Sequence, residues 1–179
     1  MPVLTLIAGP NGSDKSTLIQ SAEFSGRERL LDVDAIARTL NPSNPAAAAI
    51  LAGRELLKRI DDYFASAESF GGETTLSSRR NEVLLRRAKS LGYEIDLVFV
   101  GLDNSERCIA RIRSRAAQGG YFIPDASVRR RYARSLVNGV KALRIADRAK
   151  VYDNSGDGHR LILIVRAGAI VWRAEPLPP

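Results

Sequence analysis

The chain of 179 residues contains only one cysteine, Cys108, so it cannot form an internal disulfide, and a reducing cytoplasm is the expected location. It has no apolar run near the roughly 20 residues that a membrane-spanning helix needs. The N-terminus leads straight into an apolar stretch without a basic region, so no signal peptide is expected. Cys108 falls in a helical pattern and is predicted to be a small buried side chain. These absences, together with 45% hydrophobic residues, predict one soluble domain over 1–175 without a membrane partner.

Acidic residues are scarce in one part of the chain. The segment from Ser105 to Arg148 holds eleven Arg or Lys against three acidic residues, and it carries the whole excess behind the net charge of +7. Arginine suits phosphate because its rigid fork of donors can bind two oxygens at once. The segment therefore binds a polyanion, forms a solvated helix face, or does both. Aromatic side chains that could stack on bases are limited here to Tyr121, Phe122 and Tyr132, so nucleic acid is not a favoured partner.

A glycine-rich turn follows the first apolar stretch, 3–8. It matches the phosphate-binding pattern G-x-x-x-x-G-K-[ST] except that Asp14 replaces the second glycine. In such a loop, backbone N–H groups and a helix N-terminus converge on an anion, whereas the alternative is an ordinary glycine turn before a helix. Lys15 is expected to reach the terminal phosphates of a nucleoside triphosphate, and Ser16 to hold the magnesium ion that bridges them. The nucleotide-binding candidates are Gly9, Pro10, Asn11, Gly12, Ser13, Asp14, Lys15, Ser16 and Thr17.

Strands and helices alternate along the rest of the chain. The expected strands are 29–33, 69–74, 93–100 and 151–152, and a final hairpin pairs 161–165 with 169–172. The expected helices are 16–21, 35–40, about 45–67 with Ile50, Leu57, Ile60 and Phe64 on one stripe, and 80–91. This alternation predicts an α/β fold with a mostly parallel sheet that helices cover on both faces.

Acidic residues stand where the expected strands end. Asp32 and Asp34 close the second strand, and Glu73 closes the third. Because the carboxyl ends of parallel strands share one edge of a sheet, these acids and the glycine-rich loop are expected to meet in one cleft. Asp34 has an alternative role as the N-cap of the helix that begins at Ala35, and the two roles are compatible. The sequence 153–155 closes a later strand and is typical of a turn.

In their order and spacing, these motifs resemble the zeta-toxin-like P-loop kinases, specifically the short stand-alone bacterial members. The resemblance covers most of the chain, from Leu4 to about Ser155. The segments that carry it are 9–12 with 15–17, then 34–37, 52–54, 73–77, 92–93, the arginine helix ending at 119–120, 123–124, 129–136, 146–147 and 152–155. The resemblance implies a three-layer P-loop kinase fold with an arginine-rich helical lid at about 105–146. The predicted β-hairpin of 161–172 would follow this fold at the C-terminal end.

The family implies ATP- or GTP-dependent phosphorylation of a hydroxyl on a small substrate, with Mg²⁺. Its best known members act on UDP-N-acetylglucosamine and are neutralised by an antitoxin protein. By this resemblance Asp34 is the base that accepts the hydroxyl proton, Glu73 helps to organise the metal and the substrate, and lid arginines clamp the phosphates. Two arginine pairs stand one helical turn apart, so each pair can face one ligand. They are Arg111 with Arg115, and Arg130 with Arg134.

The chain departs from the family pattern at Asp14, Asp32 and Tyr121, where members usually have glycine, often asparagine, and histidine. Asp14 matters most because a side chain there obstructs the phosphates and carries negative charge. At about 5 Å and an effective dielectric constant near 20, two unit charges repel by roughly 3 kcal/mol. Three hypotheses follow: a kinase with impaired nucleotide binding, a binding module for phosphorylated ligands without turnover, and, least favoured, a nucleic-acid-binding protein. The presence of Asp34 and Glu73 favours the first, because a binding module needs no base.

Overall fold

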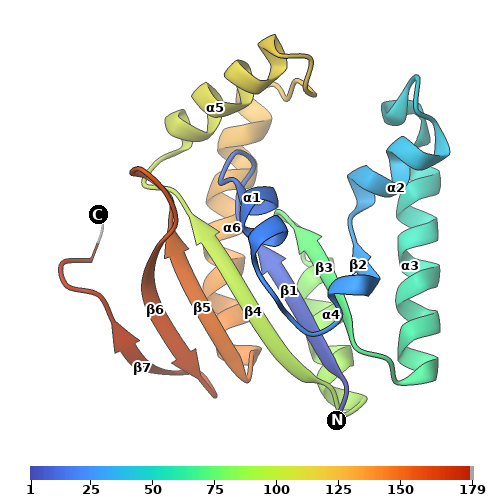
Figure 1. The fold of residues 1–179 in the computed structure, drawn as a ribbon, viewed down its shortest axis with the longest axis vertical. Coiled ribbons are helices and arrows are strands. Elements are labelled where there is room, and N and C mark those ends of the chain that lie inside the picture. The colour runs from blue at the N-terminus through green and yellow to red at the C-terminus, as the bar shows by residue number, and fades with distance from the viewer. Residues whose placement is uncertain (178–179) are drawn as a thin grey trace.

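The computed structural model describes residues 1–177, which form a seven-stranded sheet with helices around it (Figure 1). The strands are β1 (Val3–Ala8), β2 (Leu30–Leu31), β3 (Phe70–Thr74), β4 (Glu94–Gly101), β5 (Arg148–Asp153), β6 (Arg160–Arg166) and β7 (Ala169–Arg173). The helices are α1 (Lys15–Ser21), α2 (Val33–Leu40), α3 (Ala49–Ser66), α4 (Arg80–Ser90), α5 (Ser105–Ala117) and α6 (Asp125–Ile145), with short 3₁₀ turns at Arg27–Arg29 and Pro45–Ala48. Across residues 1–177, each helix is too short or too polar to cross a membrane.

The sheet has the order β2-β3-β1-β4-β5-β6-β7. β1 lies between β3 and β4 and runs parallel to both, so that Ala8 at its end stands beside Thr74 and Phe99. β2 and β5 extend this parallel set on either side, while β6 and β7 are antiparallel. The mostly parallel α/β sheet and the final hairpin predicted from the sequence are therefore confirmed. The loops after β1, β2, β3 and β5 all leave the same edge of the sheet.

Helices cover both faces of the sheet, as predicted. In Figure 1, α4 and α6 lie behind the strands and α1 lies in front of them. The main core is built on strand residues such as Leu4 and Ile95, both fully buried. Phe64 on α3 packs edge-on against Phe70 on β3, with 5.4 Å between the ring centroids. Burial of such large apolar side chains is the main favourable term in folding, and it fixes the sheet that carries the loops.

The buried stripe of α3 differs from the prediction. Ile60 and Phe64 are buried as expected, but Ile50 and Leu57 are 73% and 50% exposed. The buried face includes Ala52 instead, which lies eight residues, or about two turns, before Ile60. At 3.6 residues per turn, Ile50 and Leu57 fall at the border of that face. The helix also begins at Ala49, because residues Pro45–Ala48 form a separate 3₁₀ turn.

A second, smaller core joins α5, α6 and the end of β4. It contains Leu102, Cys108, Ile112 and Val128, all buried. The prediction that Cys108 is a buried small side chain is confirmed, and burial raises the pKa of its thiol to about 11. A thiol with so high a pKa is almost fully protonated at neutral pH and is a poor nucleophile. Cys108 therefore contributes packing rather than chemistry, and α5 and α6 form one packed unit above the edge of the sheet.

Candidate functional site

The loop between β1 and α1 turns sharply and leaves no room for side chains at two glycines. Gly9 and Gly12 have φ angles of 150° and 79°. A Cβ atom at Gly9 would lie 2.1 Å from the carbonyl oxygen of Val100, and one at Gly12 would lie 2.9 Å from that of Cys108. These glycines let the loop fold back closely on β4 and α5 before α1 begins at Lys15. The predicted strand–loop–helix order of a P-loop is therefore present.

Lys15 lies beneath this loop and is buried. Its Nζ donates hydrogen bonds to the carbonyl oxygens of Gly9 at 3.0 Å and Pro10 at 3.2 Å. It also lies 3.9 Å from Oε1 of Glu73, across the sheet edge at the end of β3. Burial lowers the pKa of Lys15 from its ordinary value, and the Glu73 carboxylate opposes that shift. A cation held in this way can exchange its carbonyl partners for the oxygens of a bound anion.

A cavity of about 460 Å³ opens beside Lys15 at the carboxyl edge of the sheet. Ser16 lines it, as do the three acids that the sequence predicted to meet there, Asp32, Asp34 and Glu73. Burial raises the pKa of Glu73, with Lys15 opposing and the nearby Asp32 and Asp34 adding to the rise. We call this space the acid cavity. It brings together a buried cation, hydroxyl groups and several carboxyl groups, which are the groups that phosphoryl transfer uses for orientation and proton transfer.

Asp32, and not Asp34, caps the helix that carries both residues. The expected helix start at Ala35 is wrong, because α2 begins at Val33 and Asp32 is its N-cap. The Asp32 carboxylate accepts a hydrogen bond of 2.8 Å from the backbone N–H of Asp34. This cap also ends β2 after Leu31, so the strand is shorter than predicted. The Asp34 side chain is thereby left free of the capping role and lines the acid cavity.

This cap can be tested through stability. Asp32→Ala should lower the free energy of unfolding by about 1 kcal/mol, because the Asp34 N–H loses its partner. Asp32→Asn should retain most of that stability, since an amide oxygen can accept the same bond. Denaturant unfolding of both variants measures the difference. Equal losses would instead assign the effect to the charge of Asp32, which lies 3.6 Å from Arg38.

The four predicted arginines are separated by the structure. Arg115 lines the acid cavity, and Arg111 donates to the carbonyl oxygens of Asn154 at 2.8 Å and Gly12 at 3.4 Å. Arg130 and Arg134 are exposed on α6 and line neither this cavity nor the one described next. Arg131, which the sequence did not single out, lines the acid cavity instead.

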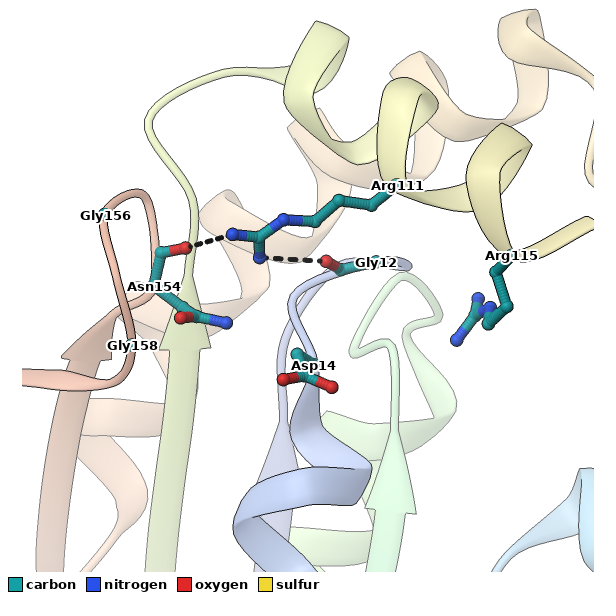
Figure 2. A pocket seen from close by; sticks show the side chains of 7 residues that line it. All are labelled: Gly12, Asp14, Arg111, Arg115, Asn154, Gly156 and Gly158. Carbon is teal, nitrogen blue, oxygen red and sulfur yellow. Dashed lines mark hydrogen bonds between the residues drawn. The ribbon is translucent and has the colours of Figure 1, made fainter. Parts of the chain in front are cut away.

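A second cavity, of about 370 Å³, lies on the other side of the glycine-rich loop. Figure 2 shows Arg111 reaching from α5 across its rim to Gly12 and Asn154. We call it the arginine cavity. Its lining residues are Gly12, Asp14, Arg111, Arg115, Asn154, Gly156 and Gly158. Arg115 and Asp14 border both cavities, so the two spaces meet at the loop.

Asp14 adopts the left-handed backbone conformation that glycine favours, with φ 66°. Its Oδ1 accepts a hydrogen bond of 2.7 Å from the hydroxyl of Thr17, one turn into α1. The backbone carbonyl of Asp14 lies 3.1 Å from Nε2 of His159. The carboxylate is therefore directed to the first turn of α1 and does not pair with Lys15. The Asp14 carboxylate therefore engages the Thr17 hydroxyl and adds negative charge to both cavities.

Sequence reasoning did not name two polar residues that line the acid cavity as candidates. They are Ser77, from the segment after β3, and Asn81, from the first turn of α4. Thr75, which follows the end of β3, also lines this cavity. The signal for Ser77 was present in the sequence as a run of hydroxyl side chains after Glu73. Asn154 belongs to 153–155, for which the sequence favours a turn at the end of a strand. Its side-chain N–H donates a hydrogen bond of 3.0 Å to the carbonyl of Ser13 and joins the loop after β5 to the glycine-rich loop.

No protein-family model matches the chain. An uncharacterized protein of Haemophilus influenzae is 36% identical to it over 124 residues, which cover 69% of this chain and 88% of that protein. The chain belongs to the same family as this Haemophilus protein. That relationship is one of sequence and carries no activity with it.

Solved structures are similar in fold. A crystal structure of AvrRxo1-ORF1:-ORF2 with ATP superposes with a TM-score of 0.69 at 12% identity, over 95% of this chain and 60% of that chain. The PezAT chromosomal toxin–antitoxin system of Streptococcus pneumoniae superposes with a TM-score of 0.60 at 14% identity, over 96% of this chain and 70% of that chain. This chain thus spans well under the full length of either. This chain shares its fold with these two proteins, which is consistent with the fold that the resemblance to zeta-toxin-like P-loop kinases implied.

Proposed function

We propose that the chain is a kinase that transfers the terminal phosphoryl group of ATP or GTP to a hydroxyl of a small substrate. One observation carries the proposal: Lys15, Ser16, Asp34, Glu73 and Arg115 line a single cavity at the carboxyl edge of the sheet. Phosphoryl transfer depends on positioning and on positive charge around the transferred group more than on covalent chemistry. This cavity offers both, together with a carboxylate for the proton.

The donor nucleotide would lie along the glycine-rich loop. Lys15 binds the terminal phosphates, and the backbone N–H groups at the start of α1 face the same oxygens. The oxygen-rich set of Ser16, Asp32 and Glu73 fits Mg²⁺, which binds few protein oxygens and takes the rest from phosphate and water. When bound, the ion would neutralise charge on the phosphates. Ser16 is the residue that we propose as its ligand.

The acceptor hydroxyl would lie next to Asp34. Asp34 accepts its proton while Lys15 and Arg115 balance charge on the transferred oxygens. Glu73 lies 3.9 Å from Lys15 and close enough to Asp32 and Asp34 for their charges to raise its pKa. It keeps Lys15 in place on one side and can accept a hydrogen bond from a substrate hydroxyl on the other.

Residues 105–146 would act as a lid over the phosphates. Arg115 and Arg131 already border the acid cavity, from α5 and α6. Arg111 is engaged with Gly12 and Asn154 and would exchange these carbonyls for phosphate oxygens on nucleotide binding. Arg130 and Arg134 would reach a ligand only if α6 moved. We therefore propose Arg111, Arg115 and Arg131 as the primary phosphate contacts, and Arg130 and Arg134 as contacts of a further closed state.

The acceptor and a protein partner follow from the resemblance. We propose a UDP-amino sugar as the acceptor, and mass spectrometry of UDP-N-acetylglucosamine incubated with the protein, ATP and magnesium tests it through the added phosphoryl mass. PezAT is a toxin–antitoxin system, and the AvrRxo1 structure contains ORF1 together with ORF2. By analogy an antitoxin partner is proposed for this chain. Co-expression with the neighbouring gene product would test it through co-purification.

A second candidate function is a binding module that holds a phosphorylated ligand without turnover. Asp14 favours it, because its carboxylate borders both cavities and engages the Thr17 hydroxyl. Asp34 and Glu73 favour the kinase, because binding alone needs neither a base nor a half-buried carboxyl group beside Lys15. Turnover of ATP in the presence of an acceptor separates the two functions.

Asp14→Gly should strengthen the binding of ATP with magnesium tenfold or more, which is about 1.4 kcal/mol or more. Glycine adopts φ 66° without strain, and its introduction removes the charge and frees the Thr17 hydroxyl. Fluorescence titration with a labelled nucleotide measures the dissociation constant.

Asp14→Asn is the matched control for this substitution. Asparagine keeps the size of the side chain and tolerates the left-handed conformation, but it is uncharged. If charge is the obstacle, Asn should recover most of the gain; if size is, only Gly should. Unchanged affinity in both variants would contradict the idea that Asp14 impairs this loop.

A further inference from the structure

Leu76 lies in a strained conformation beside the acid cavity. Its φ is 54°, in the left-handed region that bulky side chains rarely adopt, and the residue is 1% exposed. Such a conformation costs free energy of the order of 1–3 kcal/mol and persists only where surrounding contacts hold it. The strain falls within 75–79, the segment that leads from β3 to α4.

Two hydrogen bonds hold Leu76 from opposite sides. Its backbone N–H donates 3.0 Å to the hydroxyl of Thr74, a local bond two residues away. Its carbonyl accepts 2.8 Å from the side-chain N–H of Asn138, which comes from α6, 62 residues later in the chain. The Asn138 bond is therefore the long-range contact that fixes the carbonyl of the strained residue.

The segment that Leu76 bends carries side chains into the acid cavity. Thr75 and Ser77 flank Leu76, line that cavity and lie 2.9 Å from each other through their hydroxyls. Glu73 precedes them on the same wall. Any change in the Leu76 backbone would rotate Thr75 and Ser77 away from these positions, because the direction of a side chain follows φ and ψ.

Asn138 belongs to a part of α6 that is packed against the sheet. A Cβ atom on its neighbour Gly139 would lie 2.9 Å from the ring of Phe99 on β4, and Ala142 is buried one turn later. Arg131 stands seven residues before Asn138, which places both on the same face of α6, about 10 Å apart along its axis. One rigid helix thus contacts the acid cavity directly through Arg131 and holds its wall through Asn138.

We propose that Asn138 is a positioning residue that couples α6 to the wall of the acid cavity that Thr75 and Ser77 form. By holding the Leu76 carbonyl, it keeps Thr75 and Ser77 turned toward the substrate while Arg131 on the same helix faces the phosphates. The effect of Asn138 on acceptor binding rests on the proposed kinase function. Its effect on the conformation of the segment around Leu76 does not. No contact between Asn138 and a reacting atom is involved.

The structural part is tested by hydrogen exchange of the unliganded protein. Asn138→Asp should raise the exchange of the amides in 75–78 about tenfold at neutral pH, because an ionised carboxylate cannot donate to the Leu76 carbonyl. Below the pKa of the introduced carboxyl group, its O–H can donate again. The difference in exchange rate between Asn138→Asp and the unaltered protein, both measured at that pH, should then become smaller. Val137→Ala, at a 61% exposed neighbour, is the matched control and should leave this segment protected.

The catalytic part is tested with ATP, magnesium and UDP-N-acetylglucosamine as the acceptor probe. Asn138→Ala should raise the KM for the acceptor about tenfold while nucleotide affinity stays unchanged, and Val137→Ala should change neither. Exchange of 75–78 that stays at the level of the unaltered protein in both Asn138 variants would overturn the inference. Faster exchange with an unchanged acceptor KM would overturn the coupling. Absence of transfer in the unaltered protein would refute the proposed acceptor or activity, and exchange alone would then decide the positioning role.

Discussion

Asp34→Asn should lower the turnover number by about 10²–10⁴-fold while the affinity for nucleotide stays nearly unchanged. An asparagine fills the same space but cannot accept the proton of the acceptor hydroxyl. Because Asp32 is the residue that caps α2, the substitution at position 34 leaves the cap in place. Initial rates of phosphoryl transfer at saturating ATP and acceptor measure the loss.

Stability and binding serve as the controls for Asp34→Asn. Its melting temperature should remain within a few degrees of that of the unaltered protein, since the cap bond comes from the backbone N–H of residue 34 and not from its side chain. A variant that melts much earlier but turns over normally would assign Asp34 a structural role and contradict its role as base.

Lys15→Ala should abolish nucleotide binding and with it phosphoryl transfer, a loss of at least 10²-fold. Nζ of Lys15 is buried under the loop with Gly9 and Pro10 as carbonyl partners, so alanine there removes the cation that lies directly beneath the loop. The substitution also removes the positive charge 3.9 Å from Glu73, which should raise the pKa of that carboxyl group further. Thermal stabilisation by added ATP with magnesium measures the loss of binding.

Lys58→Ala is the matched control for Lys15→Ala, because Lys58 is exposed on α3 and lines neither cavity. It should keep the full thermal shift with nucleotide. Equal shifts in the Lys15 variant and in the unaltered protein would show that the loop does not bind the phosphates.

The sequence predicted those features that depend on local chemistry and on the general rules of parallel sheets. Glycines at positions 9 and 12 are required by close approach of the loop to β4 and α5, so the loop could be recognised without a structure. Asp34 and Glu73 were expected together because the ends of β2 and β3 share an edge, and both line the acid cavity.

Features that depend on which face of a helix packs could not be predicted in the same way. The spacing of Arg130 and Arg134 shows that they share a face of α6, but the packing of Val128, Gly139 and Ala142 turns that face outward. The strain at Leu76 was equally hidden, because the asparagine that holds it lies 62 residues away. Long-range contacts decide such positions, and periodicity does not record them.

Binding of a nucleoside triphosphate at the glycine-rich loop is the central claim, and calorimetric titration of ATP with magnesium tests it most directly. The unaltered protein and Asp14→Gly should both bind at one saturable site, with the variant binding at least tenfold more tightly. Absence of binding heat in both proteins, with ATP and with GTP at several temperatures, would contradict the account.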